Sequence, residues 1–283
     1  MGEARGDRSI LVTGASSGIG RAAAEMLAAR GWRVFATARR AEDLAALEAI
    51  EGVVAIFLDY TDRASIEACA ERVLAETEGR LFALFNNGAY GQLGAVEDLP
   101  TEVLRAQFEA NFFGWHDLTR RVIPAMRAQG RGRIVQCSSV LGIVAMKYRG
   151  AYTASKFALE GLTDCLRMEL RGSGIEVVSI RPGPIATRFV QHVIETFEAT
   201  IDAEASVFRE VYRHRLAKLK RGGASRFKLP ASAVVEVLMR ALDAPRPRAT
   251  YAVTVPTIVL GWVKRLVSDT MLSKITGRLS DRE

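Results

Sequence analysis

The chain has 283 residues, a length that suits one large domain or two small ones. Hydrophobic residues make up 49% and charged residues 25%, as in an ordinary globular protein, and no apolar stretch reaches the roughly 18 residues of a membrane-spanning helix. Cys69, Cys137 and Cys165 lie in periodic apolar segments without paired spacing, so we interpret them as reduced packing residues, with no metal site and no disulfide. Residues 1–9 contain no apolar run and therefore no signal peptide, so we expect a cytoplasmic protein.

The net charge of +7 is concentrated in one segment. Residues 205–228 hold eight Arg or Lys and a single acidic residue, Glu210, so this segment alone accounts for the net charge of the chain. The segment lacks the interleaved, exposed aromatic and glycine residues of single-strand binders, so we expect no nucleic-acid partner.

Apolar runs and helical patterns alternate from the start of the chain. In chain order they predict strand 9–12, helix 19–30, strand 33–38, helix 44–50, strand 53–58, helix 64–77, strand 81–85, helices 101–113 and 116–128, strand 133–137, helix 152–171, strand 175–180, two helices within 188–229, helix 230–242 and strand 251–255. This alternation, with continuously apolar strands, indicates an α/β fold: a doubly wound parallel sheet of the Rossmann type, with about seven strands. We expect one catalytic domain over residues 1–283, with a helical lid insertion at 188–229 and a C-terminal extension at 256–283.

A turn of small residues joins the first strand to the first helix. Small residues let the backbone approach a pyrophosphate, whose charge the exposed N–H groups and the helix dipole stabilise. The spacing is Gly-x-x-x-Gly-x-Gly, and a tight turn without a ligand is the alternative interpretation. The candidate phosphate contacts are Gly14, Ser16, Ser17, Gly18, Ile19 and Gly20.

The end of the second strand bears on the choice of cofactor. An acidic residue there would bind a ribose 2′-hydroxyl and favour NAD, but the chain has Arg39 and Arg40. Arg39 can hold a 2′-phosphate, with Arg40 as a helper or as a surface residue, so NADP(H) is favoured over NAD(H). Asp59, at the end of the third strand, can accept from the adenine amino group, or it can begin a helix together with Thr61 and Asp62.

Tyr152 and Lys156 form a candidate proton-transfer pair. At spacing i, i+4 both side chains leave one face of a helix, and an ammonium beside a phenol lowers the phenol pKa from its usual value near ~10. Ser138 and Ser139 end the fifth strand, where a hydroxyl can bind a substrate oxygen. The alternative is a surface aromatic, a solvated lysine and two turn-forming serines.

The chain resembles the short-chain dehydrogenase/reductase family over about residues 8–190. The matching positions are the turn Thr13 to Gly20, Asn86 and Asn87, Asn111, Ser139, Tyr152 with Lys156, and the segment Pro182 to Thr187. Within the family the chain is most similar to reductases and dehydrogenases of steroids, retinoids and long-chain aldehydes.

The resemblance implies a role for each of these residues. Tyr152 would be the general acid/base, Lys156 would lower its pKa and bind the nicotinamide ribose, and Ser139 would orient the substrate oxygen. Asn111 would hold a water that continues a proton relay through Lys156. The implied cofactor contacts are Asn87, Tyr152, Lys156, Pro182, Gly183, Ile185 and Thr187. Family members are usually oligomers through the helices that contain Asn111 and Tyr152, so we expect a homo-oligomer.

One position departs from the family pattern. The family has Asn-Asn-Ala-Gly after the fourth strand, whereas this chain has Gly88 before Ala89. Because the residue that is free to adopt positive φ moves by one place, the backbone path here is in question.

The lid and the tail combine apolar and basic residues. An apolar lining is predicted from Phe189, Val190, Val193, Ile194, Phe197, Phe208 and Tyr212. The basic residues from Arg209 to Lys220 lie largely on the other side of a helix, which is typical of a solvated lid, of peripheral contact with an anionic membrane, or of docking to an acidic carrier protein. The segment 258–267 adds a tryptophan and a basic pair, which suits a membrane interface, the last strand or a partner subunit equally well.

The sequence therefore predicts an NADP(H)-dependent oxidoreductase that interconverts an apolar aldehyde or ketone and its alcohol. Hydride would pass between nicotinamide and substrate, and the proton would pass through Tyr152. The alternatives are a 3-oxoacyl-carrier-protein reductase, which the basic lid would serve, and a dinucleotide-binding regulatory protein without turnover.

Overall fold

The computed structural model describes residues 8–222 and 227–282, which include every predicted site residue. Arg226 of the basic segment and residues 1–7 of the N-terminal segment lie outside this range. Seven parallel strands form one sheet in the order β3-β2-β1-β4-β5-β6-β9. They are β1 (Ser9–Val12), β2 (Arg33–Ala38), β3 (Val53–Phe57), β4 (Ala83–Asn86), β5 (Gly132–Cys137), β6 (Ile175–Arg181) and β9 (Thr250–Ala252). The predicted doubly wound sheet is confirmed.

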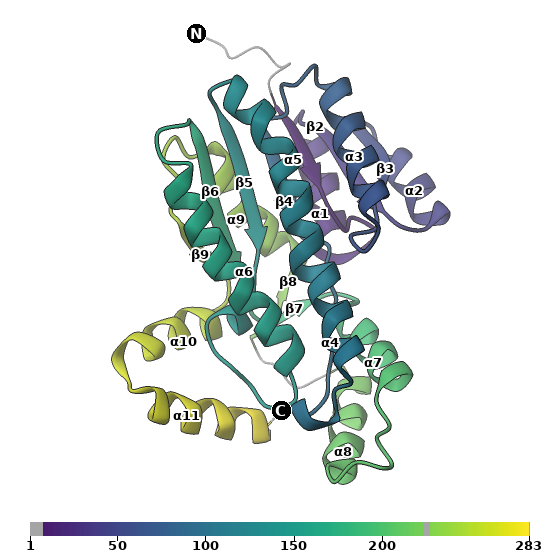
Figure 1. The fold of residues 1–283 in the computed structure, drawn as a ribbon, viewed down its shortest axis with the longest axis vertical. Helices are drawn as coiled ribbons and strands as arrows, with labels where there is room; N and C mark the ends of the chain where they lie inside the picture. Colours follow the sequence, from purple (N-terminus) through teal and green to yellow (C-terminus); the bar gives the residue numbers. More distant parts are fainter. Residues whose placement is uncertain (1–7, 223–226, 283) are drawn as a thin grey trace.

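Helices cover both faces of this sheet (Figure 1). They are α1 (Gly18–Ala28), α2 (Ala41–Glu48), α3 (Arg63–Glu76), α4 (Thr101–Phe108), α5 (Gly114–Ala128), α6 (Gly150–Glu169), α7 (Phe189–Thr200), α8 (Arg209–Lys220), α9 (Ala231–Asp243), α10 (Val255–Leu266) and α11 (Asp269–Arg282). One core cluster packs α1 and α9 against the sheet, and a second packs α3 and α5 against the opposite face. The strands are buried on both faces, which explains their continuously apolar sequences.

The carboxyl ends of the parallel strands form one edge of the sheet, and the strand order reverses between β1 and β4. Ligands of doubly wound sheets bind outside this edge. In Figure 1 the edge faces a second layer, in which α7 and α8 lie on one side and α10 and α11 on the other. Two short strands, β7 (Ile185–Ala186) and β8 (Leu229–Pro230), pair with each other and begin and end the lid segment.

Three details differ from the sequence-based expectations. The helices expected at 101–113 and 116–128 form one continuous helical run, in which a π-helical segment, Glu109–Phe113, joins α4 to α5. The last strand is shorter than 251–255, because Pro256 lies in the first turn of α10, where the N–H that it lacks has no helical partner. Cys69 and Cys137 are buried but Cys165 is exposed, so its interpretation as a packing residue is wrong.

Within the described residues, no helix combines the length and the apolar character needed to cross a membrane. The same residues contain no group of three or more His, Cys, Asp or Glu side chains arranged to hold a metal ion.

Candidate active site

The glycine-rich turn and the loop after β4 touch each other closely. Gly14 has φ +64°, and a Cβ atom on it would lie 2.3 Å from the Cα of Gly88. Asn87 joins the two segments, because its Nδ2 donates to the carbonyl oxygens of Thr13 at 3.0 Å and Gly14 at 3.3 Å. A side chain at position 14 would be both strained and in collision, so the bare backbone of this turn depends on glycine.

The exchanged order of Gly88 and Ala89 is accommodated without a left-handed residue. Neither position has positive φ. A Cβ atom at position 88 would lie 3.1 Å from the nitrogen of Gly14, so glycine allows the close approach here, while Ala89 packs against the core. The carbonyl oxygen of Gly88 accepts a hydrogen bond from Trp115 Nε1 at 2.8 Å. The concern about the backbone path is therefore removed.

One cavity of about 1320 Å³ runs from the glycine-rich turn to the lid. Most of the predicted cofactor residues line it: Gly14, Ser16, Ser17, Gly18, Ile19, Arg39, Asp59, Asn87, Tyr152, Lys156, Pro182, Gly183, Ile185 and Thr187. Ser139 also lines the cavity, but Gly20 and Asn111 do not. Gly20 instead packs under the turn, where a Cβ atom would lie 2.2 Å from the carbonyl oxygen of Gly14. The turn and a long cavity beside it fit an extended dinucleotide.

The two arginines after β2 have different surroundings. Arg40 is paired with Asp43 at 2.8 Å and with Glu42 at 3.3 Å, and it does not line the cavity. Arg39 lines the cavity and makes no ion pair within the described residues. Its charge acts on Tyr90, whose pKa burial raises. Arg39 is therefore available to an anion, whereas Arg40 neutralises the acidic start of α2.

Asp59 has a structural partner as well as a place in the cavity wall. Its Oδ1 accepts from the backbone nitrogen of Thr61 at 2.9 Å and from the Thr61 hydroxyl at 2.8 Å. Asp62 caps α3 by accepting from the nitrogen of Ala64 at 2.9 Å. The two hydrogen bonds with Thr61 support the turn-forming interpretation of Asp59. Asp59 also lines the cavity, so a contact with the cofactor is compatible with this turn.

Lys156 is held deep in the wall of the cavity. Its Nζ donates to the carbonyl oxygen of Cys137 at 2.9 Å and lies 4.1 Å from the centre of the Trp115 ring. Burial lowers the pKa of Lys156 to about 8, and the charges of Cys137 and Glu160 oppose this shift. The electrostatic attraction of an aromatic face offsets part of the hydration energy that a buried cation loses.

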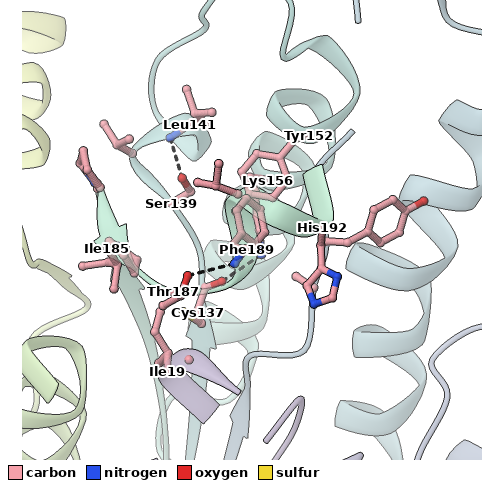
Figure 2. Close-up of a pocket in the computed structure, with 18 of the residues that line it drawn as sticks. Ile19, Cys137, Ser139, Leu141, Tyr152, Lys156, Ile185, Thr187, Phe189 and His192 are labelled. Carbon is pink, nitrogen blue, oxygen red and sulfur yellow. Dashed lines mark hydrogen bonds between the residues drawn. The ribbon is translucent and has the colours of Figure 1, made fainter. Parts of the chain in front are cut away.

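Tyr152 lies one helical turn before Lys156 and near Ser139, as Figure 2 shows. Burial raises the pKa of Tyr152 above its ordinary value; a hydrogen bond with Ser139 and the charge of Arg149 oppose the shift. The expectation that Lys156 lowers this pKa stays a prediction: its ammonium donates to the Cys137 carbonyl, and it lies 5.7 Å from the centre of the Tyr152 ring. The phenol is therefore protonated at neutral pH and able to donate.

Asn111 lies in the π-helical segment and is fully buried. Its side chain binds the backbone of Tyr90 twice: Nδ2 donates to the oxygen at 2.8 Å and Oδ1 accepts from the nitrogen at 3.2 Å. The amide therefore fixes the loop after β4, beside the cavity. A π-helical turn disturbs the regular backbone pairing of a helix, a feature often found at functional sites.

Several residues of the site were missed in the sequence. Trp115 follows Asn111 by four residues on the same helical face, and this spacing is a signal that could have identified it. Glu160 follows Lys156 by the same interval, and it accepts from Arg181 at 2.6 and 2.9 Å and from the Ser179 hydroxyl at 2.7 Å. This buried network fixes α6 to β6. Arg149 is a cavity-lining cation that no local motif marks.

The lid residues that line the cavity are largely not the ones that the sequence indicated. Phe189 and Val190 line the cavity, and the Phe189 ring lies 5.6 Å from that of Tyr152. The other predicted lining residues, Val193, Ile194, Phe197, Phe208 and Tyr212, do not line it. Most of them form a cluster that holds the lid on the protein, with Leu93 and Ala95. The predicted apolar lining is instead completed by other elements, through Leu141, Met146, Val259 and Leu279.

The chain is similar to known proteins over nearly its whole length. A family model described as short chain dehydrogenase matches residues 8–197. YbbO of Escherichia coli K12, described as an uncharacterized oxidoreductase, is 38% identical over 268 residues, covering 95% of this chain and 93% of that protein. The NADPH-dependent 3-dehydrocapnine reductase of Ornithobacterium rhinotracheale is 31% identical over 278 residues, covering 95% of each.

A solved short-chain dehydrogenase from Streptomyces avermitilis superposes with a TM-score of 0.75 at 30% identity, over 96% of this chain and 98% of that one. The fold, the site geometry and these similarities agree with the resemblance seen in the sequence. The chain belongs to the short-chain dehydrogenase/reductase family of oxidoreductases.

Proposed function

We propose that the protein is an NADP(H)-dependent oxidoreductase that interconverts an apolar aldehyde or ketone and the corresponding alcohol. The observation that carries the proposal is one continuous cavity, in which Tyr152 lies between the glycine-rich turn and an apolar chamber. A nicotinamide dinucleotide bound along the turn supplies or accepts the hydride. The residues of the chain position the substrate and supply the proton.

The side chains of the site divide this work. The Ser139 hydroxyl lies beside Tyr152 and can donate to a carbonyl oxygen, which orients it toward the phenol. Tyr152 then donates its proton to the developing alkoxide, or takes it back in the reverse direction. Lys156 keeps a positive charge one helical turn away, which stabilises the phenolate that forms when Tyr152 gives up its proton.

The preference for NADP(H) is supported by Arg39. It lines the cavity and has no carboxylate partner among the described residues, so its charge is available to a 2′-phosphate. The printed name of the Ornithobacterium relative, which includes NADPH dependence, agrees with this proposal.

The alternatives have weaker support. A regulatory protein without turnover does not require a protonated Tyr152, Ser139 and a buried Lys156 in one cavity. A 3-oxoacyl-carrier-protein reductase needs an exposed basic face, but Arg213 and Lys220 on the outer face of the lid pair with Glu204 at 2.7 Å and with Glu198 at 2.7 Å. The local charge offered to an acidic carrier is thereby reduced.

The proposal is tested by NADPH oxidation across a panel of apolar aldehydes and ketones, with Tyr152→Phe as the variant. Loss of the proton donor should lower kcat by about 10²-fold or more while the Kd for NADPH stays the same. Tyr251→Phe, which removes a hydroxyl outside the cavity, is the matched control. NADPH binding without turnover of any carbonyl would favour the alternative of a dinucleotide-binding regulatory protein.

We also propose that the protein is a homo-oligomer through α4, α5 and α6. These helices and the π-helical segment leave four large apolar side chains exposed: Leu104, Phe113, Phe157 and Met168. Exposed apolar side chains on adjacent helices favour association with a second copy. Light scattering after size exclusion should show an oligomer for the wild type and a smaller species for Phe113→Ser. A monomeric wild type would contradict this proposal.

Peripheral membrane contact is a further proposal, and it concerns α10. This helix exposes Ile258, Val259, Trp262 and Leu266, and Arg265 lies 5.6 Å from the Trp262 ring. Leu260 on its other side packs on Ile143 and Val144. Flotation with anionic liposomes should recover the wild type and lose Trp262→Ser; equal recovery with neutral liposomes would argue against charge-assisted docking.

A further inference from the structure

Trp115 of α5 contacts both halves of the site. It is the second residue of α5, directly after the π-helical segment, and its side chain is fully buried. Its ring centre lies 4.1 Å from Nζ of Lys156. Its Nε1 donates to the carbonyl oxygen of Gly88 at 2.8 Å, and Gly88 in turn touches Gly14 of the glycine-rich turn. One side chain therefore joins the lysine of the proton-transfer pair to the backbone on the cofactor side.

Lys156 needs a source of stabilisation besides its hydrogen bond. It is 1% exposed, so its ammonium has lost nearly all contact with bulk water. Among the described residues its one hydrogen-bond acceptor is the carbonyl oxygen of Cys137, at 2.9 Å. An ammonium has three protons, so this bond leaves two of them without a protein acceptor. The face of an aromatic ring attracts a cation, and tryptophan does so more strongly than tyrosine or phenylalanine. Trp115 therefore supplies an attraction that hydrogen bonding does not.

The titratable groups around Lys156 do not replace this attraction. Glu160, one turn later on α6, is engaged by the guanidinium of Arg181 on β6 at 2.6 Å. Burial raises the pKa of the Cys137 thiol on β5 to about 11, so this thiol is neutral at pH 7. Burial also raises the pKa of Tyr152, so its phenol is neutral as well. The ammonium therefore has no free anion beside it among the described residues, and the indole ring is its nearest electrostatic partner after the carbonyl.

Contacts other than Lys156 fix the indole ring in place. The ring of Tyr60 packs against it, with the two ring centres 6.2 Å apart. Gly114 allows this close packing, because a Cβ atom there would lie 2.5 Å from the carbonyl oxygen of Tyr60. The hydrogen bond to Gly88 restrains the edge of the indole that carries the N–H. The ring is therefore held independently of the lysine, and its position can set that of the ammonium.

We propose that Trp115 is a positioning residue for turnover: its ring holds the charged ammonium of Lys156, and its N–H ties that position to the backbone at Gly88. Trp115 does not line the cavity, so it acts through these two residues and not on the substrate. Loss of the ring should therefore change the titration of Lys156, and loss of the N–H should change cofactor binding. This inference rests on the proposed role of Lys156 in turnover, but the contact itself can be measured without a cofactor.

Tryptophan fluorescence of the cofactor-free protein tests the contact directly. The double variant Trp32→Phe/Trp262→Phe leaves Trp115 as the one tryptophan of the chain. Its emission should change with a midpoint near pH 8, because the attraction between ammonium and ring ends when Lys156 loses its proton. Lys156→Met in this background should abolish the transition, and Cys137→Ser, which removes the neighbouring thiol, should keep it. Emission that does not change near pH 8, or a transition there that survives Lys156→Met, overturns the proposal.

Two substitutions of Trp115 separate its two contacts. Trp115→Phe keeps an aromatic face but removes the N–H, so the Kd for NADPH should rise about threefold while the pH dependence of kcat/KM stays close to that of the wild type. Trp115→Leu removes both contacts, so kcat/KM should also begin to fall about one pH unit lower, because the charged lysine is less stabilised. Trp32→Leu removes another buried indole, outside the cavity, and is the matched control that should change neither quantity.

The outcomes distinguish this inference from the proposed function. A fluorescence transition that depends on Lys156, without reduction of any carbonyl, would refute the carbonyl chemistry and keep the contact between ring and ammonium. Carbonyl reduction with the same pH profile in the wild type and Trp115→Leu, or with the same shift in Trp32→Leu, would refute the positioning role alone. If Trp115→Leu does not fold, the fluorescence titration and the NADPH affinity of Trp115→Phe still decide, since both proteins keep a large aromatic ring at position 115.

Discussion

The strand edge that carries the glycine-rich turn and the layer that closes over it are built in different ways. At the edge, small residues let backbones meet, as where a Cβ atom on Gly14 would lie 2.3 Å from Gly88. In the covering layer, long side chains make the contacts, as where Arg215 stacks on Tyr148 and reaches Ser280. Backbone contact tolerates few residue types, whereas side-chain contact tolerates many. The edge therefore has a recognisable sequence pattern and the covering layer does not.

The largest effect is expected at glycine positions of the strand edge, where backbones touch. Gly14→Ala adds a Cβ atom at φ +64° against Gly88, whereas Gly31→Ala adds one at φ +78° with nothing within 4 Å. We expect a cost of about 2–5 kcal/mol for the first and about 1 kcal/mol for the second. NADPH titration and thermal unfolding of both variants measure this; similar losses would mean that backbone strain, not contact, governs the turn.

Arg39 and Arg40 test whether one side chain at the strand edge selects the cofactor. Arg39→Gln removes a cation from the cavity wall, whereas Arg40→Gln only breaks the pairs with Asp43 and Glu42. The first should raise KM for NADPH about 10- to 100-fold with little change for NADH, because a charge-assisted contact contributes about 1.5–3 kcal/mol. An unchanged ratio of NADPH to NADH use in Arg39→Gln would remove Arg39 from this role.

Tyr212 tests how firmly the covering layer is attached. Its hydroxyl accepts from the backbone nitrogen of Ala95 at 2.8 Å and donates to Asp98. Tyr212→Phe leaves a buried N–H without its acceptor, which should lower the free energy of unfolding by about 1–3 kcal/mol. Tyr251→Phe removes the partner of the Arg248 nitrogen near the surface and should cost less. Equal losses in denaturant titrations would show that the lid contact is not buried in solution.

The smallest expected effect is the pH dependence of turnover, which follows from the burial of Lys156 and Tyr152. Lys156 is charged below about pH 8 because burial lowers its pKa, and Tyr152 stays protonated because burial raises its own. The kcat/KM for carbonyl reduction should be constant below this pH and fall as the pH rises through about 8, by about twofold from pH 7 to pH 8. A profile that first falls near pH 10 would place the titration on another group.

The sequence predicted the strand edge in most particulars. The spacing of Tyr152 and Lys156 and the turn at Gly14 come from single segments, so local pattern is enough to find them. The pKa of Tyr152 could not be predicted in this way. Its shift comes first from burial, which arises only when other elements of the fold pack around the phenol.

The basic lid shows the limit most clearly. The sequence concentrates the net charge in residues 205–228, along the lid. The structure pairs Lys220 with Glu198 and Arg213 with Glu204, two acids that lie outside that segment, and turns Arg215 inward. A net charge along the chain does not predict a local charge in space, because the partners come from elsewhere.

Strand periodicity and the motif spacings act over a few residues, so they were enough to identify the family, the parallel sheet and the candidate proton donor. The folded structure adds what no local pattern shows: Arg40 is neutralised, Asn111 binds the backbone of Tyr90, and the cations around Arg215 line the cavity. Each of these depends on contacts between segments distant along the chain. Burial and partners, which set the chemistry of a charged group, arise only when those segments meet.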